Sequence, residues 1–407
     1  MNLNFKIASI VLFGYTTMFG VSNCVAQGTF FEAGAGISFF DLGIDPVTNE
    51  IVLVGSENVG GQNTASVFRL SADRTSLQSD ALVGLVPNST IVRGISPDGS
   101  TIAGTSTASD GSLQATTWLS TAPSTPIGIG STTPSGDILT QSSGIAAFNG
   151  GIVGTATADV GFPIFSRFEF TPPNSLSVSR GDPFGVGVSA VSADGSVTLV
   201  RDFDTGVPFA ADSDPATGGA TFGFGNFDTL REVSPNGLHI AGDADATPIS
   251  GVGAGTGGGV WSRDSDDENF VFTLLFSPDF DLPDPQPLFT DVFSDISTVI
   301  DVSDSGFAIG NADNGPFIWN ESFDDDSGFS VVENFDEWLL RAGGIALPSP
   351  TTAVRAITES ETGVLNFAVQ TSESSFIVTV VPEPSSAAIL TVSMIGFTFR
   401  RKRDLVG

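Results

Sequence analysis

The chain has 407 residues, of which 46 are acidic and 15 basic, so its formal net charge is −31. A field of this sign repels nucleic acid and anionic lipid and attracts divalent cations, which argues against a nucleic-acid partner. The hydrophobic fraction of 40% and the 34 phenylalanines are too high for a disordered acidic chain, so a folded body is expected.

The first 26 residues have the order of a secretory signal peptide. Lys6 ends a short positive region, residues 7–19 are largely apolar, and Cys24-Val25-Ala26 places small residues at the two positions that a signal peptidase reads. Cleavage after Ala26 would leave Gln27 as the first residue. Cys24 is the only cysteine, so the exported chain would carry no thiol to oxidise, which fits an oxidising compartment.

Residues 27–380 contain an internal repeat that we count seven times. In the clearest copy, residues 92–104, a strand runs into the turn Pro97-Asp98-Gly99 and a second strand begins at Thr101. Proline presets φ, aspartate tolerates the bend and glycine takes a positive φ, so these residues are typical of a tight turn. The apolar residues that we treat as equivalent lie 51, 50, 46, 42, 69 and 55 residues apart: Ile44, Ile95, Ile145, Val191, Val233, Val302 and Ile357.

Each unit predicts a strand, a turn, a second strand, a third strand with an aromatic residue such as Trp118, and a short fourth strand. Four antiparallel strands per ~50 residues are typical of a propeller blade. We therefore predict an all-β fold, a propeller of seven four-stranded blades, with a signal helix before it and a short hydrophobic helix after it. The run Thr29 to Phe40 is expected to pair with the last unit and close the ring.

The sequence Ile-Ser-Pro-Asp-Gly at residues 95–99 resembles the HAF-type repeats of exported bacterial proteins. This resemblance implies a fold and no activity. Residues 334–343 look like the short helix that precedes the final repeat in such proteins. Asn334 and Glu337 are expected to form a capping box, and Gly343 to end the helix. Its apolar residues share one face: Phe335, Trp338 and Leu339.

The last segment, residues 381–407, has three parts in a fixed order. Pro382-Glu383-Pro384 precedes the largely apolar residues 385–399. A basic cluster then follows: Arg400, Arg401, Lys402 and Arg403. This order resembles the PEP-CTERM sorting signal, which implies export, retention at the inner membrane and processing by an exosortase. As a helix, residues 387–399 would span about 20 Å, less than a hydrocarbon core of ~30 Å, and the basic cluster is expected to stay cytoplasmic.

The exported chain offers little for catalysis. Between residues 27 and 399 it has one histidine, His239, and no cysteine, lysine or tyrosine. His239 occupies a strand position that other units fill with varied residues, so neither a Ser-His-Asp triad nor a His/Cys zinc site is expected. A carboxylate-dependent carbohydrate-active enzyme stays open as the alternative. Two carboxylates converging in a channel pocket would favour this enzyme, whereas a channel lined by Phe, Ser and Gly would favour a protein that displays loops for binding.

Acidic loops are the candidates for a ligand ion, because calcium prefers several oxygen ligands from a flexible loop. No loop has EF-hand spacing, and no other cofactor is expected. The candidate residues form three groups: Asp264, Asp266, Asp267 and Glu268; Asp279, Asp281 and Asp284; and Asp324, Asp325 and Asp326. The prediction from the sequence is thus a non-enzymatic cell-surface or extracellular-matrix propeller. Its partners would be signal peptidase and exosortase during export, and polysaccharide or surface proteins afterwards.

Overall fold

The computed structural model describes residues 27–381 of the chain. Within this range it leaves out short segments: 133, 135, 137, 160–162, 174, 181–185, 203–206, 213–220, 225–228, 246–255, 266–268, 278–285, 288–297, 313–314 and 324–329. The predicted signal peptide (1–26) lies outside the described residues, and so does the predicted sorting segment (381–407) apart from Val381. No helix within the described residues combines the length and the apolar character that crossing a membrane requires.

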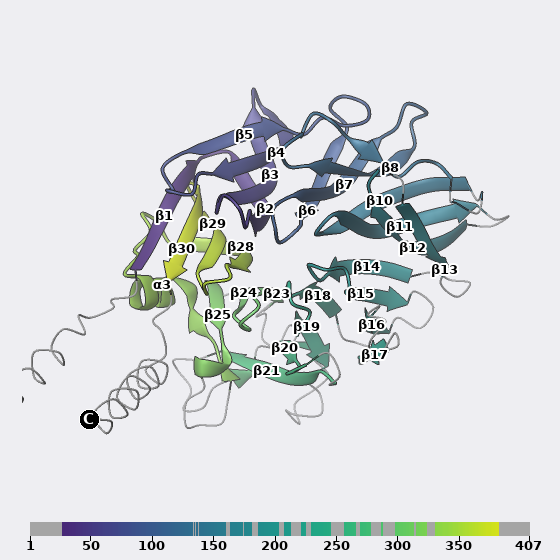
Figure 1. Cartoon of the computed structure of the whole chain (residues 1–407). Coiled ribbons are helices and arrows are strands. Elements are labelled where there is room, and N and C mark those ends of the chain that lie inside the picture. The colour runs from purple at the N-terminus through teal and green to yellow at the C-terminus, as the bar shows by residue number, and fades with distance from the viewer. Residues whose placement is uncertain are drawn as a thin grey trace, which may run out of the picture.

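The described strands form seven sheets arranged as blades of a ring (Figure 1), and the four main strands of each are antiparallel. Blade 1 holds β2 (Ile37–Ile44), β3 (Ile51–Val59), β4 (Gln62–Leu70) and β5 (Leu77–Ala81). Blade 2 holds β6 (Thr90–Ile95), β7 (Thr101–Thr107), β8 (Leu113–Leu119) and β9 (Ile127–Gly128). Blade 3 holds β10 (Ile138–Phe148), β11 (Gly151–Asp159), β12 (Pro163–Thr171) and β13 (Ser175–Arg180). Blade 4 holds β14 (Val186–Val191), β15 (Val197–Asp202), β16 (Pro208–Asp212) and β17 (Thr221–Gly223).

Blade 5 holds β18 (Thr229–Val233), β19 (His239–Asp245), β20 (Thr256–Ser262) and β21 (Val271–Ser277). Its outer edge is extended by β22 (Gln286–Pro287) and by β26 (Ser330–Val331), which pairs with β21 in parallel. Blade 6 holds β23 (Thr298–Val302), β24 (Ala308–Ala312), β25 (Gly315–Trp319) and β27 (Glu333–Asn334), with a 3-10 turn, η1 (Glu321–Phe323), after β25. Blade 7 holds β28 (Thr351–Glu359), β29 (Leu365–Thr371), β30 (Ser375–Val381) and the N-terminal β1 (Gln27–Gly34).

The ring is closed by the N-terminal strand. β1 pairs with β30 from Gln27 opposite Val381 to Gly34 opposite Ser375, and purple β1 lies beside yellow β30 in Figure 1. The predicted pairing of the N-terminal run with the last unit is therefore confirmed for β1. It is wrong for the end of that run, because the chain turns after Gly34 and Ile37 begins the inner strand of blade 1.

Inner strands lie against one another around the ring, and β28 of blade 7 closes on β2 of blade 1. The turns that follow them are also joined. The main-chain amide of Ile44 donates to the carbonyl of Pro97 in the next blade over 2.8 Å. Hydrogen bonds join five further junctions. Two are again between main-chain groups, Asn149 to Ala193 and Ala193 to Pro235. In the other three a main-chain amide donates to a side-chain oxygen: Asp98 to Asn149, Asn236 to Asp304, and Ser305 to Glu359. Neighbouring blades are thereby held in register at one end of the channel.

The repeat aspartates form the turns, as predicted. The Asp98 carboxylate accepts bonds from the Ser100 amide (3.0 Å) and from the Ser96 hydroxyl (2.6 Å). Gly99 has a φ of 68°, which a side chain would strain. Asp194 repeats the arrangement in blade 4. These carboxylates are therefore occupied by local hydrogen bonds.

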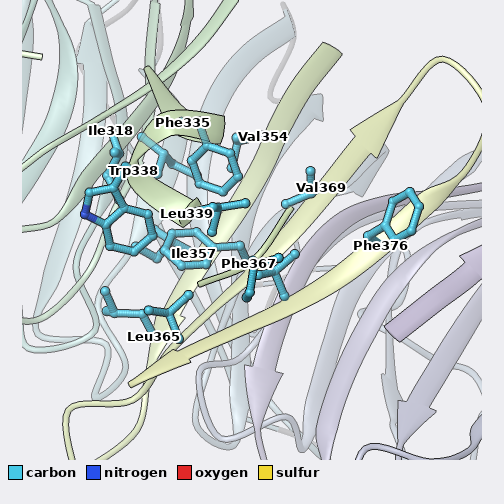
Figure 2. Packing of buried hydrophobic residues seen from close by; sticks show 14 residues of the cluster. Ile318, Phe335, Trp338, Leu339, Val354, Ile357, Leu365, Phe367, Val369 and Phe376 are labelled. Carbon is cyan, nitrogen blue, oxygen red and sulfur yellow. The ribbon is translucent and has the colours of Figure 1, made fainter. Parts of the chain in front are cut away.

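The helix α3 (Phe335–Gly343) packs between blades 6 and 7 and covers their shared core (Figure 2). Asn334 caps it, its side chain accepting from the amides of Asp336 and Glu337. The predicted end was one residue early: Gly344, with a φ of 65°, is the left-handed cap and Gly343 is still helical. The buried face is the predicted one, formed by Phe335, Trp338 and Leu339.

Two of the weaker repeats are aligned wrongly by sequence. Every inner strand carries at least one β-bulge, and β10 and β28 have a second register shift near their first residues. Counting from the bulge nearer the strand's end makes Leu42 in blade 1 and Ala147 in blade 3 the equivalents of Ile95. The sequence alignment used Ile44 and Ile145 instead, each displaced by two residues. It failed because the hairpins of blades 1 and 3 differ in length from that of blade 2, and the bulge adds a residue that apolar patterning does not reveal.

Candidate functional site

The bulges surround a pocket of about 300 Å³ in the central channel. Each blade offers two adjacent residues at its bulge, because a bulge leaves two residues of one strand opposite one residue of its partner. The bulge positions are Phe40, Arg93, Ile145, Ser189, Arg231, Ile300 and Arg355. The post-bulge positions are Asp41, Gly94, Ala146, Ala190, Glu232, Asp301 and Ala356. All of these residues except Arg231 and Ala190 line the pocket.

Charge is divided between the two sets of positions. The bulge positions include three arginines, and the post-bulge positions include three acids. Arg231 forms an ion pair with Asp243 at 2.8 Å. Arg93 and Arg355, which are exposed, make no hydrogen bond or ion pair with another described residue. Two unpaired guanidinium groups therefore share one pocket in a strongly acidic protein.

Asp41 and Asp301 each join two blades. The Asp41 carboxylate accepts from the amide of Leu42 (2.7 Å) and from that of Ile95 in blade 2 (2.8 Å). It passes over Gly94, where an added Cβ would lie 3.1 Å from its oxygen. Asp301 repeats this arrangement between blades 6 and 7, accepting from Val302 (2.7 Å) and Ile357 (2.8 Å). Both acids thus satisfy edge amides of the inner strands.

Glu232 differs from the other two acids. It accepts one long bond, 3.3 Å, from the amide of Val233. The equivalent amide in the next blade belongs to Val302, and the Asp301 carboxylate already occupies it. Glu232 therefore has no cross-blade partner among the described residues and remains available to a ligand in the pocket.

Burial controls the protonation of these acids. Burial raises the pKa of Asp41 to about 6 and, with the nearby charge of Asp41, that of Asp301 to about 7, although backbone hydrogen bonds oppose both shifts. Burial first, then the charges of Asp301 and Asp41, raise the pKa of Glu232 well above its usual range. Near pH 6 most of this negative charge is absent, so the two free arginines give the pocket a positive balance.

We predict that replacing Glu232 by Gln raises the melting temperature at pH 8, on the order of 2 °C, and leaves it unchanged at pH 5. A carboxyl with a raised pKa holds its proton in the folded state and loses it in the unfolded state. Folding is therefore favoured at low pH, and this advantage is lost as the pH rises from about 4 through the raised pKa. Glutamine is neutral throughout and removes the penalty.

The measurement is thermal unfolding of both proteins at the two pH values. Glu361→Gln is the control, because Glu361 lies exposed in a turn of blade 7 and its removal changes the net charge equally. An identical gain at pH 5, or an equal gain in the control at pH 8, would show that the pocket does not destabilise ionised Glu232.

His239 lies between blades rather than in the pocket. Its Nδ1 is 2.9 Å from the Ser262 hydroxyl, and the ring packs on Gly306 of blade 6. Burial lowers its pKa. No described carboxylate is hydrogen-bonded to the ring, so among the described residues it does not complete a triad.

The calcium candidates fall mostly outside the described residues. Asp264 is exposed. The other candidates are not described: Asp266, Asp267, Glu268, Asp279, Asp281, Asp284 and residues 324–326. Within the described ranges, no three acidic, histidine or cysteine side chains lie close enough together to hold a metal ion. The calcium site stays a prediction.

The pocket acids were missed by sequence reasoning, although a signal existed for two of them. Aligned on the turn, Glu232 and Asp301 stand in a column that is otherwise glycine or alanine in the other units. A large acid in a column of small residues is unusual for a packing position and indicates a channel-facing one. Asp41 gave no such signal, because the shifted alignment placed Gly43 in that column.

Comparison with known proteins identifies no family for this chain. No family model and no curated protein matches the chain. Similar solved structures include the β-propeller domain of Cps50 (Swd1) from Myceliophteria thermophila, with 7% identity and a TM-score of 0.44 over 86% of this chain and 98% of that one. The β-propeller domain of the trilobed protease from Pyrococcus furiosus has 10% identity and a TM-score of 0.46 over 84% and 95%. A putative TolB from Agrobacterium tumefaciens has 14% identity and a TM-score of 0.37 over 61% and 88%.

Proposed function

We propose that the protein is an exported cell-surface or extracellular-matrix propeller that is sorted by an exosortase-type system and contacts polysaccharide or surface proteins. The sorting part of this proposal is supported by the order of Pro382-Glu383-Pro384, the apolar residues 385–399 and the basic cluster at residues 400–403. The binding part is supported by the central pocket and its unpaired polar groups.

The position of the two chain ends is the structural observation that favours export and sorting. Gln27, the residue expected to follow signal cleavage, lies opposite Val381, the first residue of the predicted sorting segment. Both segments therefore leave the body at one edge of blade 7. A membrane held at that edge would leave the inner strands and their pocket unattached.

Replacing Pro382, Glu383 and Pro384 by alanine should abolish processing in a host with an exosortase, because the tripeptide is the part an enzyme can recognise just outside the bilayer. The unprocessed form should accumulate in the membrane fraction, where immunoblotting detects it as a larger species. The matched control replaces another Pro-x-Pro triplet, Pro348-Ser349-Pro350. Normal processing of the first variant would disprove the sorting assignment.

A carbohydrate-active enzyme is the second candidate, because three carboxyl groups line the pocket. Glycoside hydrolysis generally needs one acid to donate a proton and a second, unencumbered carboxylate to act as nucleophile or base. Asp41 and Asp301 each use both oxygens to hold backbone amides, which leaves Glu232 as the single free acid. One free acid favours binding over hydrolysis. The decisive experiment incubates the purified protein with the host's extracellular polysaccharide: retention without new reducing ends supports display, and new reducing ends that Glu232→Gln abolishes support the enzyme.

A further inference from the structure

The pocket combines an aromatic face with two cationic groups. In ring order, blade 1 lies between blades 7 and 2, so Phe40 stands between Arg355 and Arg93. Phe40 is 44% exposed and lines the pocket. Across the ring, blade 5 contributes Glu232. A ligand in the pocket would therefore meet the two guanidinium groups and the apolar Phe40 ring on one side and the Glu232 carboxyl group on the other.

The arrangement disfavours a cation. The oxygens of Asp41 and Asp301 already accept amide bonds, and the two arginines would repel a positive ligand. A guanidinium group instead matches a carboxylate or sulfate, to which it can donate two parallel hydrogen bonds. A volume of about 300 Å³ is at the lower end for small-molecule sites, which suits one or two sugar units rather than a folded partner.

We infer that the central pocket binds an acidic saccharide, with Arg93 and Arg355 holding its carboxylate or sulfate, Phe40 packing against the sugar ring and Glu232 bonding a hydroxyl. This inference rests on the proposed function, since it names the ligand class of the same surface. An aromatic ring supplies apolar contact with little loss of conformational entropy, and a protonated carboxyl both donates and accepts hydrogen bonds.

Binding should weaken as the pH rises. The charged groups facing the pocket are Asp41 on β2, Arg93 on β6, Glu232 on β18, Asp301 on β23 and Arg355 on β28; β10 and β14 contribute the uncharged Ile145 and Ser189. Arg231, beside Glu232, is neutralised by Asp243. As Asp41 and Asp301 ionise, around their pKa values of about 6 and 7, their charge offsets that of the two arginines. The pKa of Glu232 is also raised by burial, and its ionisation at higher pH adds a third negative charge that opposes an anion.

The test is calorimetric titration of the purified full protein at pH 5.5 with three ligands: an oligogalacturonate, a sulfated galactan oligosaccharide and a neutral galacto-oligosaccharide. Either acidic ligand should bind at least about tenfold more tightly than the neutral one, the value expected when charge-assisted hydrogen bonds are lost. The ratio of the two acidic ligands identifies the preferred anionic group. The double variant Arg93→Gln, Arg355→Gln should bind the acidic ligands about tenfold more weakly than the wild type does. The control Arg341→Gln, which removes an exposed arginine on α3, should bind them as the wild type does.

A pH series separates a role of Glu232 in ligand binding from a merely structural role. Wild-type binding should fall by about tenfold between pH 5.5 and pH 8, and Glu232→Gln should make that fall smaller, because only Asp41 and Asp301 then ionise. Equal binding of the neutral ligand, no binding of either acidic saccharide, or full binding by the double arginine variant would overturn the inference. So would binding only of an acidic peptide. If the double arginine variant still bound to host polysaccharide, the proposed function would be supported, but the central pocket would not be the binding site.

Discussion

A chain that lacks β1 should lose more than about 10 °C of melting temperature and become prone to aggregation. Starting the protein at Ile37 instead of Gln27 exposes the edge of β30, whose amides and carbonyls then lack partners. It also removes the contact of Phe30 with Phe376, whose ring centroids lie 5.9 Å apart. The ring would remain joined only through inner strands and turns. Thermal unfolding and limited proteolysis of the two chains measure the difference.

A peptide of residues 27–36 supplied in trans should restore the missing strand, because an extended peptide can complete an exposed sheet edge. A scrambled peptide is the control. Gly28→Val provides a point variant of the same strand, since an added Cβ there would lie 2.3 Å from Ile345. An unchanged melting temperature of the shortened chain would show that the pairing of β1 with β30 does not stabilise the ring.

Most of the fold could be predicted because its signals are local. The turn around Asp98 depends on a few neighbouring residues, and the same chemistry recurs in several units, so seven repeats yielded seven blades. The helix α3 was predicted for the same reason: Asn334 and the spacing of Phe335, Trp338 and Leu339 act within one segment. Propensity and capping are properties that a short window of sequence contains.

The pocket could not be predicted in the same way because its geometry depends on the bulges. A bulge inserts a residue into one strand, which shifts the alternation of buried and exposed positions. Arg93 therefore faces the channel beside Gly94 instead of alternating with it. The partnership of Asp41 with the Ile95 amide, 54 residues away, exists only once the blades are packed. Neither relation leaves a periodic pattern in the sequence.

The charge of the whole chain was also a poor guide to the charge of the site. With 46 acidic residues, the body suggests affinity for cations. Burial raises the pKa of Asp41 and Asp301 towards neutrality, whereas a guanidinium group stays charged under all ordinary conditions. The pocket therefore becomes the place where an anion can bind despite the surrounding field, and recognition depends on local desolvation rather than on net charge.

Replacing Phe367 by Ala should lower the free energy of unfolding by about 3–5 kcal/mol. Phe367 on β29 is fully buried, and its ring lies 5.2 Å from that of Phe335 and 5.5 Å from that of Trp338 (Figure 2). Truncation would leave a cavity between blade 7 and α3, and a rigid β-sheet cannot collapse to fill it.

Denaturant unfolding of the variant measures the effect, and Phe40→Ala is the matched control. Phe40 is 44% exposed in the pocket, so the same chemical change there should cost less than about 1 kcal/mol. The two variants should also separate stability from binding: Phe367→Ala should lower the melting temperature while acidic saccharide still binds to the folded fraction, and Phe40→Ala should weaken that binding with little effect on stability. Equal destabilisation by Phe367→Ala and Phe40→Ala would mean that the packing of α3 on blade 7 does not stabilise that blade. The aromatic core beneath α3 would then contribute no more than an exposed ring does.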